Sequence, residues 1–194
     1  MDSAGSSHHR TWPRKACRRF DIAGHAHELT FSCYQCRPLF EADWICEILA
    51  GSINRARDKH QFLTWAYVFM KEHVHLVIRP LQNQYSISQI LKAIKQPVAQ
   101  RVAHRIRQES DAKQLKLMDA DSRSGRLQFW QPGGGFDRNL ISEAAVLSAI
   151  EYIHNNPVQR GLCADRYEWR WSSAAAWSGK NPGPVVVDVG SLHL

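Results

Sequence analysis

Alternation of apolar and polar residues predicts the strands of this chain. Within 25–33, apolar residues fall at every second position, which is the period of a half-buried strand. Two β-branched and aromatic runs, 62–70 and 73–78, are separated by two charged residues, and we expect them to pair as antiparallel strands. A short strand or extended segment is expected at FDRNL, residues 136–140.

Apolar residues at helical spacing predict two helices in the first part of the chain. The segment 41–57 has acidic residues in its first turn and arginine in its last, as the helix dipole favours. A second helix begins after Ser86, where Gln89 completes a capping-box pattern, and we expect Pro97 to kink it. Across 85–108 there are lysines and arginines but no acid, which predicts either a nucleic-acid contact surface or an ordinary solvated face.

The second part of the chain predicts one further helix and more irregular structure. This third helix is expected at 143–155, with Ser142 as its N-terminal cap and Pro157 as its stop. Residues 111–127 are polar without a clear period, so we expect a long loop there. After the third helix, tryptophans and tyrosine indicate irregular chain packed by aromatic side chains, with a weak strand or a tail at its end.

The length of 194 residues fits one domain with modest tails. We expect a mobile basic arm at 1–17, a compact domain at 18–177 and a tail at 178–194. With 25 Lys and Arg against 18 Asp and Glu, the net charge of +7 favours a polyanionic partner, nucleic acid first. An odd number of cysteines favours reduced thiols, and the chain has no secretion signal and no apolar run that would span a membrane, so we expect a cytoplasmic protein.

A pair of histidines offers the first candidate chemistry. His73 and His75 lie two positions apart on a predicted strand, so both imidazoles face one side and can bind one metal ion. The spacing alone is weak evidence, because the same pattern recurs at His25 and His27 in a chain with ten histidines. The flanking apolar strands are what favour the pair at 73 and 75.

The second candidate is the end of the third helix. Tyr152 and Asn156 are four residues apart, so a phenol and an amide are presented on one helical face. The alternative interpretation is a packed tyrosine and an asparagine that caps the helix. Neither motif by itself distinguishes a structural role from a catalytic one.

The two motifs in this order resemble the IS200-like single-tyrosine transposases of the HUH superfamily, and within it the REP-associated tyrosine transposases. The resemblance spans residues 18 to 177. The matching segments are MKEHVHLVIRP (70–80), SISQILKAIK (86–95), FWQPGGGFDRNL (129–140), AIEYIHNNPVQRGL (149–162) and YEWRWSSA (167–174).

The resemblance implies a fold and an activity. The fold is ferredoxin-like α+β, a central antiparallel sheet with helices packed on one face, which agrees with the predicted order of strands and helices. The activity is the cutting and joining of single-stranded DNA, with Tyr152 attacking the scissile phosphate to give a 5′-phosphotyrosine. His73, His75 and Asn156 would bind one divalent metal, Mg²⁺ or Mn²⁺.

The resemblance also implies DNA contacts. Lys92, Lys95, Arg18 and Arg19 would follow phosphates, and Trp130 would stack on unpaired bases, although burial is the commoner fate of a tryptophan. The expected partner is single-stranded or hairpin DNA in the cytoplasm, at the nucleoid. Members of the family act as monomers or as homodimers, and the sequence leaves both open.

Two other functions are compatible with the same residues. A nucleic-acid-binding module without catalysis needs only the positive charge. A metal-dependent phosphodiester hydrolase would use the two histidines but would direct water, and not Tyr152, at the phosphate. Formation of a covalent protein–DNA adduct separates both alternatives from a transposase.

Overall fold

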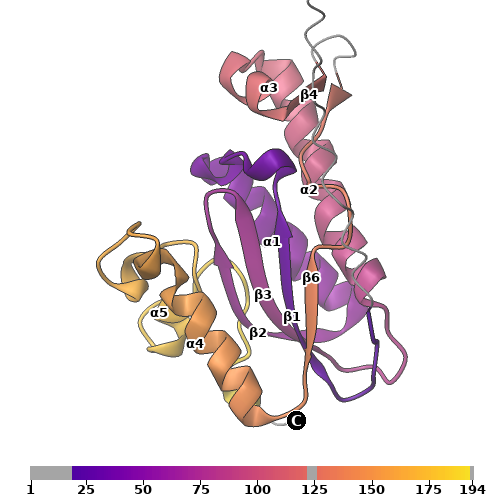
Figure 1. The fold of residues 1–194 in the computed structure, drawn as a ribbon, viewed down its shortest axis with the longest axis vertical. Coiled ribbons are helices and arrows are strands. Elements are labelled where there is room, and N and C mark those ends of the chain that lie inside the picture. The colour runs from indigo at the N-terminus through magenta and orange to yellow at the C-terminus, as the bar shows by residue number, and fades with distance from the viewer. Residues whose placement is uncertain (1–18, 122–125, 193–194) are drawn as a thin grey trace, which may run out of the picture.

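The main sheet is antiparallel in the computed structural model, which describes residues 19–121 and 126–192. Its strands are β1 (Ala26–Ser32), β2 (Phe62–Phe69), β3 (His73–Pro80) and β6 (Phe136–Leu140). They are ordered β2-β3-β1-β6, with β1 and β3 in the centre (Figure 1). This order, reached through a helix after β1 and another after β3, is ferredoxin-like and confirms the α+β class.

Two long helices cover one face of the sheet. They are α1 (Asp43–His60) and α2 (Ile87–Glu109). Leu29 and Phe31 of β1 point to this side, where they pack with the buried stripes of both helices. The helix α2 continues through Pro97, and the apolar residues on either side of the proline are buried in the same core.

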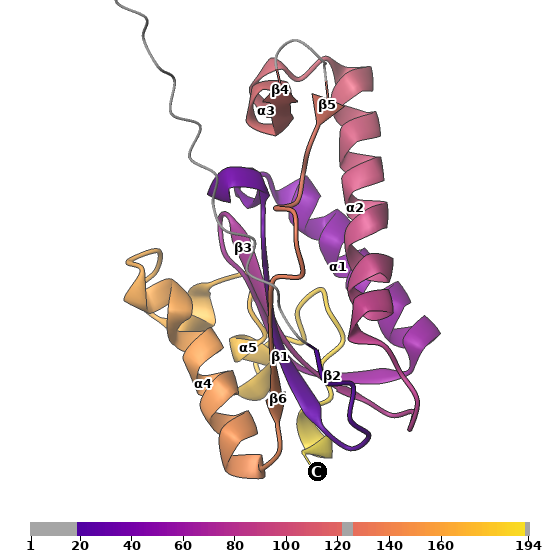
Figure 2. The same cartoon turned by 45° about the vertical axis from the view of Figure 1, so that its right-hand side comes forward.

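The opposite face is covered by α4 (Glu143–Gln159), as Figures 1 and 2 show. Val146, Ile150 and Ile153 of this helix pack on Val68 and Val77 of the sheet. The expectation that the helices pack on one face therefore holds for α1 and α2 but not for α4. The cause is that β2 and β3 bury apolar side chains on both faces, so each face requires a cover. Among the described residues, no helix combines the length and apolar character needed to cross a bilayer.

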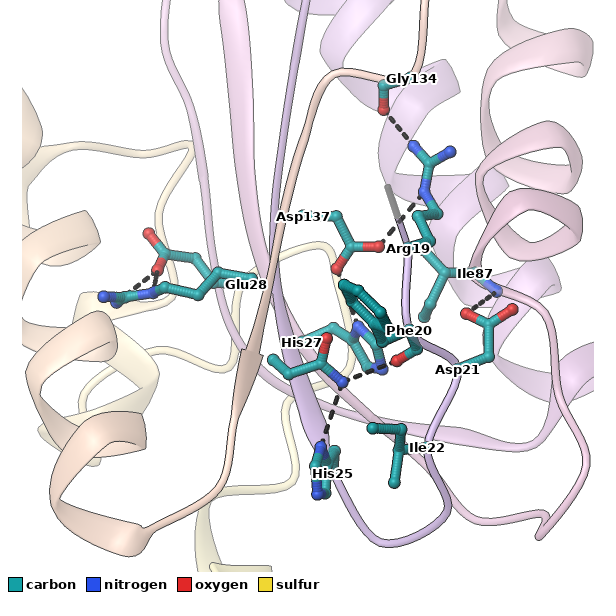
Figure 3. Close-up of polar contacts among 12 residues, drawn as sticks. Arg19, Phe20, Asp21, Ile22, His25, His27, Glu28, Ile87, Gly134 and Asp137 are labelled. Atoms are coloured by element: carbon teal, nitrogen blue, oxygen red, sulfur yellow. Dashed lines mark hydrogen bonds and ion pairs between the residues drawn. The ribbon is translucent and has the colours of Figure 1, made fainter. Parts of the chain in front are cut away.

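Three local expectations differ from the structure. The polar segment after α2 contains α3 (Ala112–Met118), whose cap Asp111 accepts a hydrogen bond from the Gln114 backbone N at 3.0 Å. Ser86 makes no side-chain cap for α2, and Asp21 accepts from the backbone N of Ile87 at 3.3 Å instead (Figure 3). The helix α4 does not stop before Pro157 but runs to Gln159, and the Arg160 N–H closes a further turn on Asn156 O.

The shorter elements complete the described chain. They are β4 (Asp119–Asp121), β5 (Arg126–Leu127), α5 (Ala174–Trp177) and the 3₁₀ turns Tyr34–Cys36, Leu39–Glu41, Arg166–Glu168 and Val189–Ser191.

The segment after residue 177 packs against the domain and is not a separate tail. Val185 is fully buried in the core on the α1 side. The Asp188 carboxylate accepts from the Arg57 guanidinium at 2.6 Å and from the Thr64 backbone N at 2.9 Å. The boundary expected at 177 is therefore too early for the described residues. The arm expected at 1–17 lies outside the described residues.

Candidate active site

Two histidines meet on the central strand β3. His73 and His75 share the face of the sheet that α4 covers, because Val77, at the same alternation, packs in that core. Their Nε2 atoms are 2.9 Å apart, and their rings are nearly perpendicular. His75 is buried and His73 is partly exposed. The structure thus brings the two expected metal ligands to one point.

Neighbouring side chains fix the tautomers of this pair. The Glu72 carboxylate lies 3.1 Å from His73 Nδ1 and only accepts, so Nδ1 carries the hydrogen and Nε2 offers a lone pair. The Thr30 hydroxyl lies 2.9 Å from His75 Nδ1, and a hydroxyl can donate or accept. His75 can therefore keep its hydrogen on Nε2, facing His73, or transfer it to Nδ1 and free Nε2 for a cation.

Both imidazoles are poor bases in this environment. Burial lowers the pKa of His75 to about 3, and the charges of His73 and Arg160 act in the same direction. Burial also lowers the pKa of His73, although the nearby Glu72 carboxylate acts to raise it. Neutral imidazoles are the form that binds a metal ion, so the donor atoms are suited to one.

The helix α4 brings an amide and a phenol to the same point. Asn156 is buried, and its side-chain Nδ2 lies 3.3 Å from His75 Nε2; a half-turn of the amide presents its oxygen there instead. The Tyr152 ring lies edge-on to the His75 ring, with 5.8 Å between centroids, and is 48% exposed. All four residues expected in the active site therefore lie together, and the tyrosine remains open to a substrate.

Two further residues belong to this site and were not expected from the sequence. Thr30 is one, because it lies opposite His75 in the pairing of β1 with β3. Arg160 is the other, because its guanidinium donates to the Glu72 carboxylate that holds His73. Arg160 could have been predicted from the sequence, because it follows Asn156 by four residues and so lies near it on the same helical face. Thr30 could not, because the sequence does not show which residue lies opposite His75.

The second histidine pair has a different environment. His27 is fully buried, with its Nδ1 2.8 Å from Asp137 (Figure 3). Its Nε2 lies 2.8 Å from the Tyr85 hydroxyl. His25 Nδ1 lies 3.2 Å from the Asn139 side chain. Since both nitrogens of His27 are engaged by protein groups, this pair is not arranged as metal ligands.

The residues expected to contact DNA gather on the other side of the sheet. Arg19, Lys92, Lys95 and Trp130 line one hollow of about 390 Å³ beside α2. The Lys95 ammonium lies 5.7 Å from the centre of the Phe31 ring, which belongs to the core on the α1 and α2 side. These residues are therefore separated from the histidine pair by the sheet. Arg18 lies outside the described residues.

The fold is α+β, and its antiparallel sheet carries a histidine pair that faces a tyrosine on a helix. This arrangement is expected of a single-tyrosine transposase. The family model of IS200-like transposases matches residues 24–156, which include both motifs. The chain therefore belongs to the IS200-like transposase family. No curated protein matches the chain.

One solved structure supports the fold, and a second is more distant. A REP-associated tyrosine transposase bound to a REP hairpin is similar at a TM-score of 0.64 and 20% identity, covering 89% of this chain and 91% of that one. A structure assigned as a transposase from Deinococcus radiodurans R1 has a TM-score of 0.43 and 19% identity, covering 71% and 95%.

Proposed function

We propose that this protein cuts and rejoins single-stranded DNA at hairpin sites through a 5′-phosphotyrosine on Tyr152. The observation that carries the proposal is the half-exposed Tyr152 ring beside His73, His75 and Asn156. Membership of the transposase family supports the activity, and the hairpin bound to the similar REP-associated transposase supports the substrate.

The donor set fits a divalent cation, Mg²⁺ or Mn²⁺, held by His73, His75 and the amide oxygen of Asn156. The fit rests on two neutral imidazoles whose Nε2 atoms converge and on a hydroxyl that accepts either tautomer of His75. Such an ion supplies positive charge to an oxygen of the reacting phosphate. Two imidazoles also suit softer metals, so we infer the choice of Mg²⁺ or Mn²⁺ from the family and not from the ligands.

The chain's own residues perform the exchange. The Tyr152 oxygen forms a bond to phosphorus, the bond from phosphorus to the 3′ oxygen breaks, and the phenolic proton passes to water as the 3′ oxygen gains one. One phosphodiester replaces another, so the strand can be rejoined without an external energy source. Glu72 and Thr30 hold the imidazoles in place during both steps.

Other tyrosines are less suited to attack. Tyr67 is fully buried, and burial raises its pKa to about 12. The Tyr85 hydroxyl donates to Ile22 O and contacts His27, and burial raises its pKa to about 12. Tyr152 combines exposure with contact to the histidine pair, which supports it as the nucleophile.

The test is covalent trapping on labelled single-stranded hairpins with Mn²⁺, followed by a denaturing gel. Tyr152→Phe is expected to bind the hairpin like the parent but to form no adduct, because it lacks the attacking oxygen. Tyr167→Phe is the matched control and should form the adduct. An adduct mapped by mass spectrometry to any other residue, or cleavage without an adduct, would favour the hydrolase or a different nucleophile.

Metal-ligand variants test the other half of the site. His73→Ala or His75→Ala should abolish cleavage and spare most of the DNA affinity, as should EDTA. His25→Ala is the control that should leave cleavage nearly unchanged. His27→Ala is unsuitable as a control, because removing its two buried hydrogen bonds is expected to destabilise the fold. If His25→Ala abolished cleavage and His75→Ala remained active, the assignment of the metal site to β3 would be wrong.

We also infer that Tyr152 acts in cis, within one chain. The 5.8 Å between the Tyr152 and His75 rings is measured within a single chain, so no second subunit is required to complete the site. A mixture of Tyr152→Phe and His75→Ala proteins should therefore remain inactive. Recovery of adduct formation in the mixture would indicate that the tyrosine is donated to a partner chain.

A further inference from the structure

The edge strand β6, next to the proposed active site, carries an exposed aromatic residue. Phe136 begins the edge strand β6 and is 50% exposed. It pairs with Thr30 of β1, and Thr30 pairs with His75 of β3. Paired residues share a face of the sheet, so Phe136 lies in the same row as His75, two strands away, or about 10 Å.

The chain just before Phe136 borders the hollow on the opposite face. Gly133 and Gly134 line it, together with Arg19, Lys95 and Trp130. The Lys95 ammonium lies 5.5 Å from the centre of the Trp130 ring, and its pKa is lowered by burial and by the charge of Arg19. Among the described residues, no carboxylate lies within ion-pair distance of Lys95.

The charge balance of this hollow favours an anion. The Arg19 guanidinium forms an ion pair with the Asp137 carboxylate at 3.2 Å, and this carboxylate also contacts His27 (Figure 3). Lys95 is partly buried against the Phe31 and Trp130 rings, which attract its charge more weakly than a carboxylate would, so a counterion would still stabilise it. None of the residues that line the hollow is acidic. A phosphate group would supply the missing negative charge.

We propose that the single strand flanking the hairpin crosses the sheet edge at Phe136, where one base stacks, and places a phosphate in the hollow beside Lys95. This inference rests on the proposed function, because it takes the strand cut at Tyr152 as the occupant. An exposed aromatic ring next to a basic hollow is the combination by which proteins bind single strands without reading their sequence. The edge of β6 connects the face that carries the histidines with the face that carries the hollow.

The test compares hairpins with and without single-stranded flanks by fluorescence anisotropy, in EDTA so that no strand is cut. Phe136→Ala should weaken binding of the flanked hairpin about tenfold and leave the bare hairpin unchanged, while Phe136→Trp should retain affinity. Lys95→Gln should reduce the slope of log affinity against log salt by about one, for the flanked hairpin alone.

Two matched controls cover nonspecific effects of these changes. Ile141→Ala removes an exposed apolar side chain just beyond β6, and Lys113→Gln removes one charge on α3, at the far end of α2 (Figure 2). Both should bind flanked hairpins like the parent. Thermal denaturation of every variant shows whether it is folded.

The outcomes separate this inference from the proposed function. If the parent forms the Tyr152 adduct but Phe136→Ala and Lys95→Gln bind flanked hairpins like the controls, the strand path is wrong and the cleavage mechanism stands. If both variants weaken the binding of bare and flanked hairpins equally, Phe136 and Lys95 bind the hairpin itself, and the path is also wrong. If no adduct forms while the flank-specific losses remain, the proposed chemistry fails, and the path holds for a bound flanking strand but not for a strand cut at Tyr152.

Discussion

Removing the Thr30 hydroxyl should weaken metal binding without removing a metal ligand. Thr30 Oγ1 lies 2.9 Å from His75 Nδ1, on the side of the ring opposite to the proposed ion. When Nε2 binds a cation, Nδ1 must carry the hydrogen and donate it to Thr30. Thr30→Val keeps the shape of the side chain and deletes the acceptor.

The size of the effect follows from comparing the two states of His75. Without an ion, the lost bond is one between neutral groups, which contributes about 0.5–1.5 kcal/mol. With an ion bound, the imidazole is polarised, and a charge-assisted bond contributes about 1.5–3 kcal/mol. The difference between the midpoints of these two ranges is about 1.25 kcal/mol, which corresponds to a roughly eightfold loss of metal affinity.

The assay is titration of Mn²⁺ into the protein bound to a hairpin, in a Tyr152→Phe background that prevents turnover. In the single variant Thr30→Val, which keeps Tyr152, the Mn²⁺ concentration that gives half-maximal cleavage should rise by the same factor. Saturating Mn²⁺ should restore its cleavage rate to that of the parent. Thr64→Val is the matched control, because Thr64 is fully buried and its hydroxyl has no hydrogen-bond partner within the described chain. Its metal affinity should equal that of the parent.

Equal metal affinity in Thr30→Val and Thr64→Val would refute the assignment of Thr30 as the residue that orients His75. Loss of cleavage at every Mn²⁺ concentration would also refute it, because a positioning residue acts through affinity and leaves the saturated rate largely intact.

Three further predictions follow from the same structure. Mn²⁺ at about 100 times its Kd should raise the unfolding free energy by about 2.7 kcal/mol, measured by chemical denaturation, and His75→Ala should abolish this gain. Burial lowers the pKa of His154 to about 4, so the neutral imidazole contributes fully to stability above pH 6.5, and this contribution is lost as the pH falls towards 4. Urea titrations should show a loss of about 3 kcal/mol in the unfolding free energy over this range. The loss should be absent in His154→Asn. Gly135→Ala should destabilise by at least about 2 kcal/mol, since φ is +72° and a Cβ would lie 2.3 Å from Thr30 O, whereas Gly161→Ala, with φ +65° and open space, should cost about 1 kcal/mol.

The strands and the long helices were predictable because each carries its own periodic signal. The second helix layer was predictable in principle as well, because the run at 62–70 is apolar at consecutive positions and must be buried on both sides. The short helix α3 was not, since seven residues are too few for a clear helical period. The docking of Val185 was missed because an isolated apolar segment without period does not indicate its partner.

The residues of the proposed active site divide in the same way. His73, His75, Tyr152 and Asn156 were found because each pair is defined by its spacing within one element. Thr30 depends on which residue of β1 lies opposite His75, and strand register is set by the pairing of the whole sheet.

The geometry of the proposed active site depends on how the core fixes the rotation of α4. His154 lies between Tyr152 and Asn156 in sequence, and its Nε2 lies 2.7 Å from Ser173 Oγ. That hydroxyl already donates to the Tyr67 carbonyl, so the His154 N–H must be the donor, and α4 is thereby tied to β2 through Ser173. The apolar stripe of α4 sets its distance from the sheet, and this buried contact sets its rotation. Tyr152 is consequently placed against His75 by residues that are buried in the core.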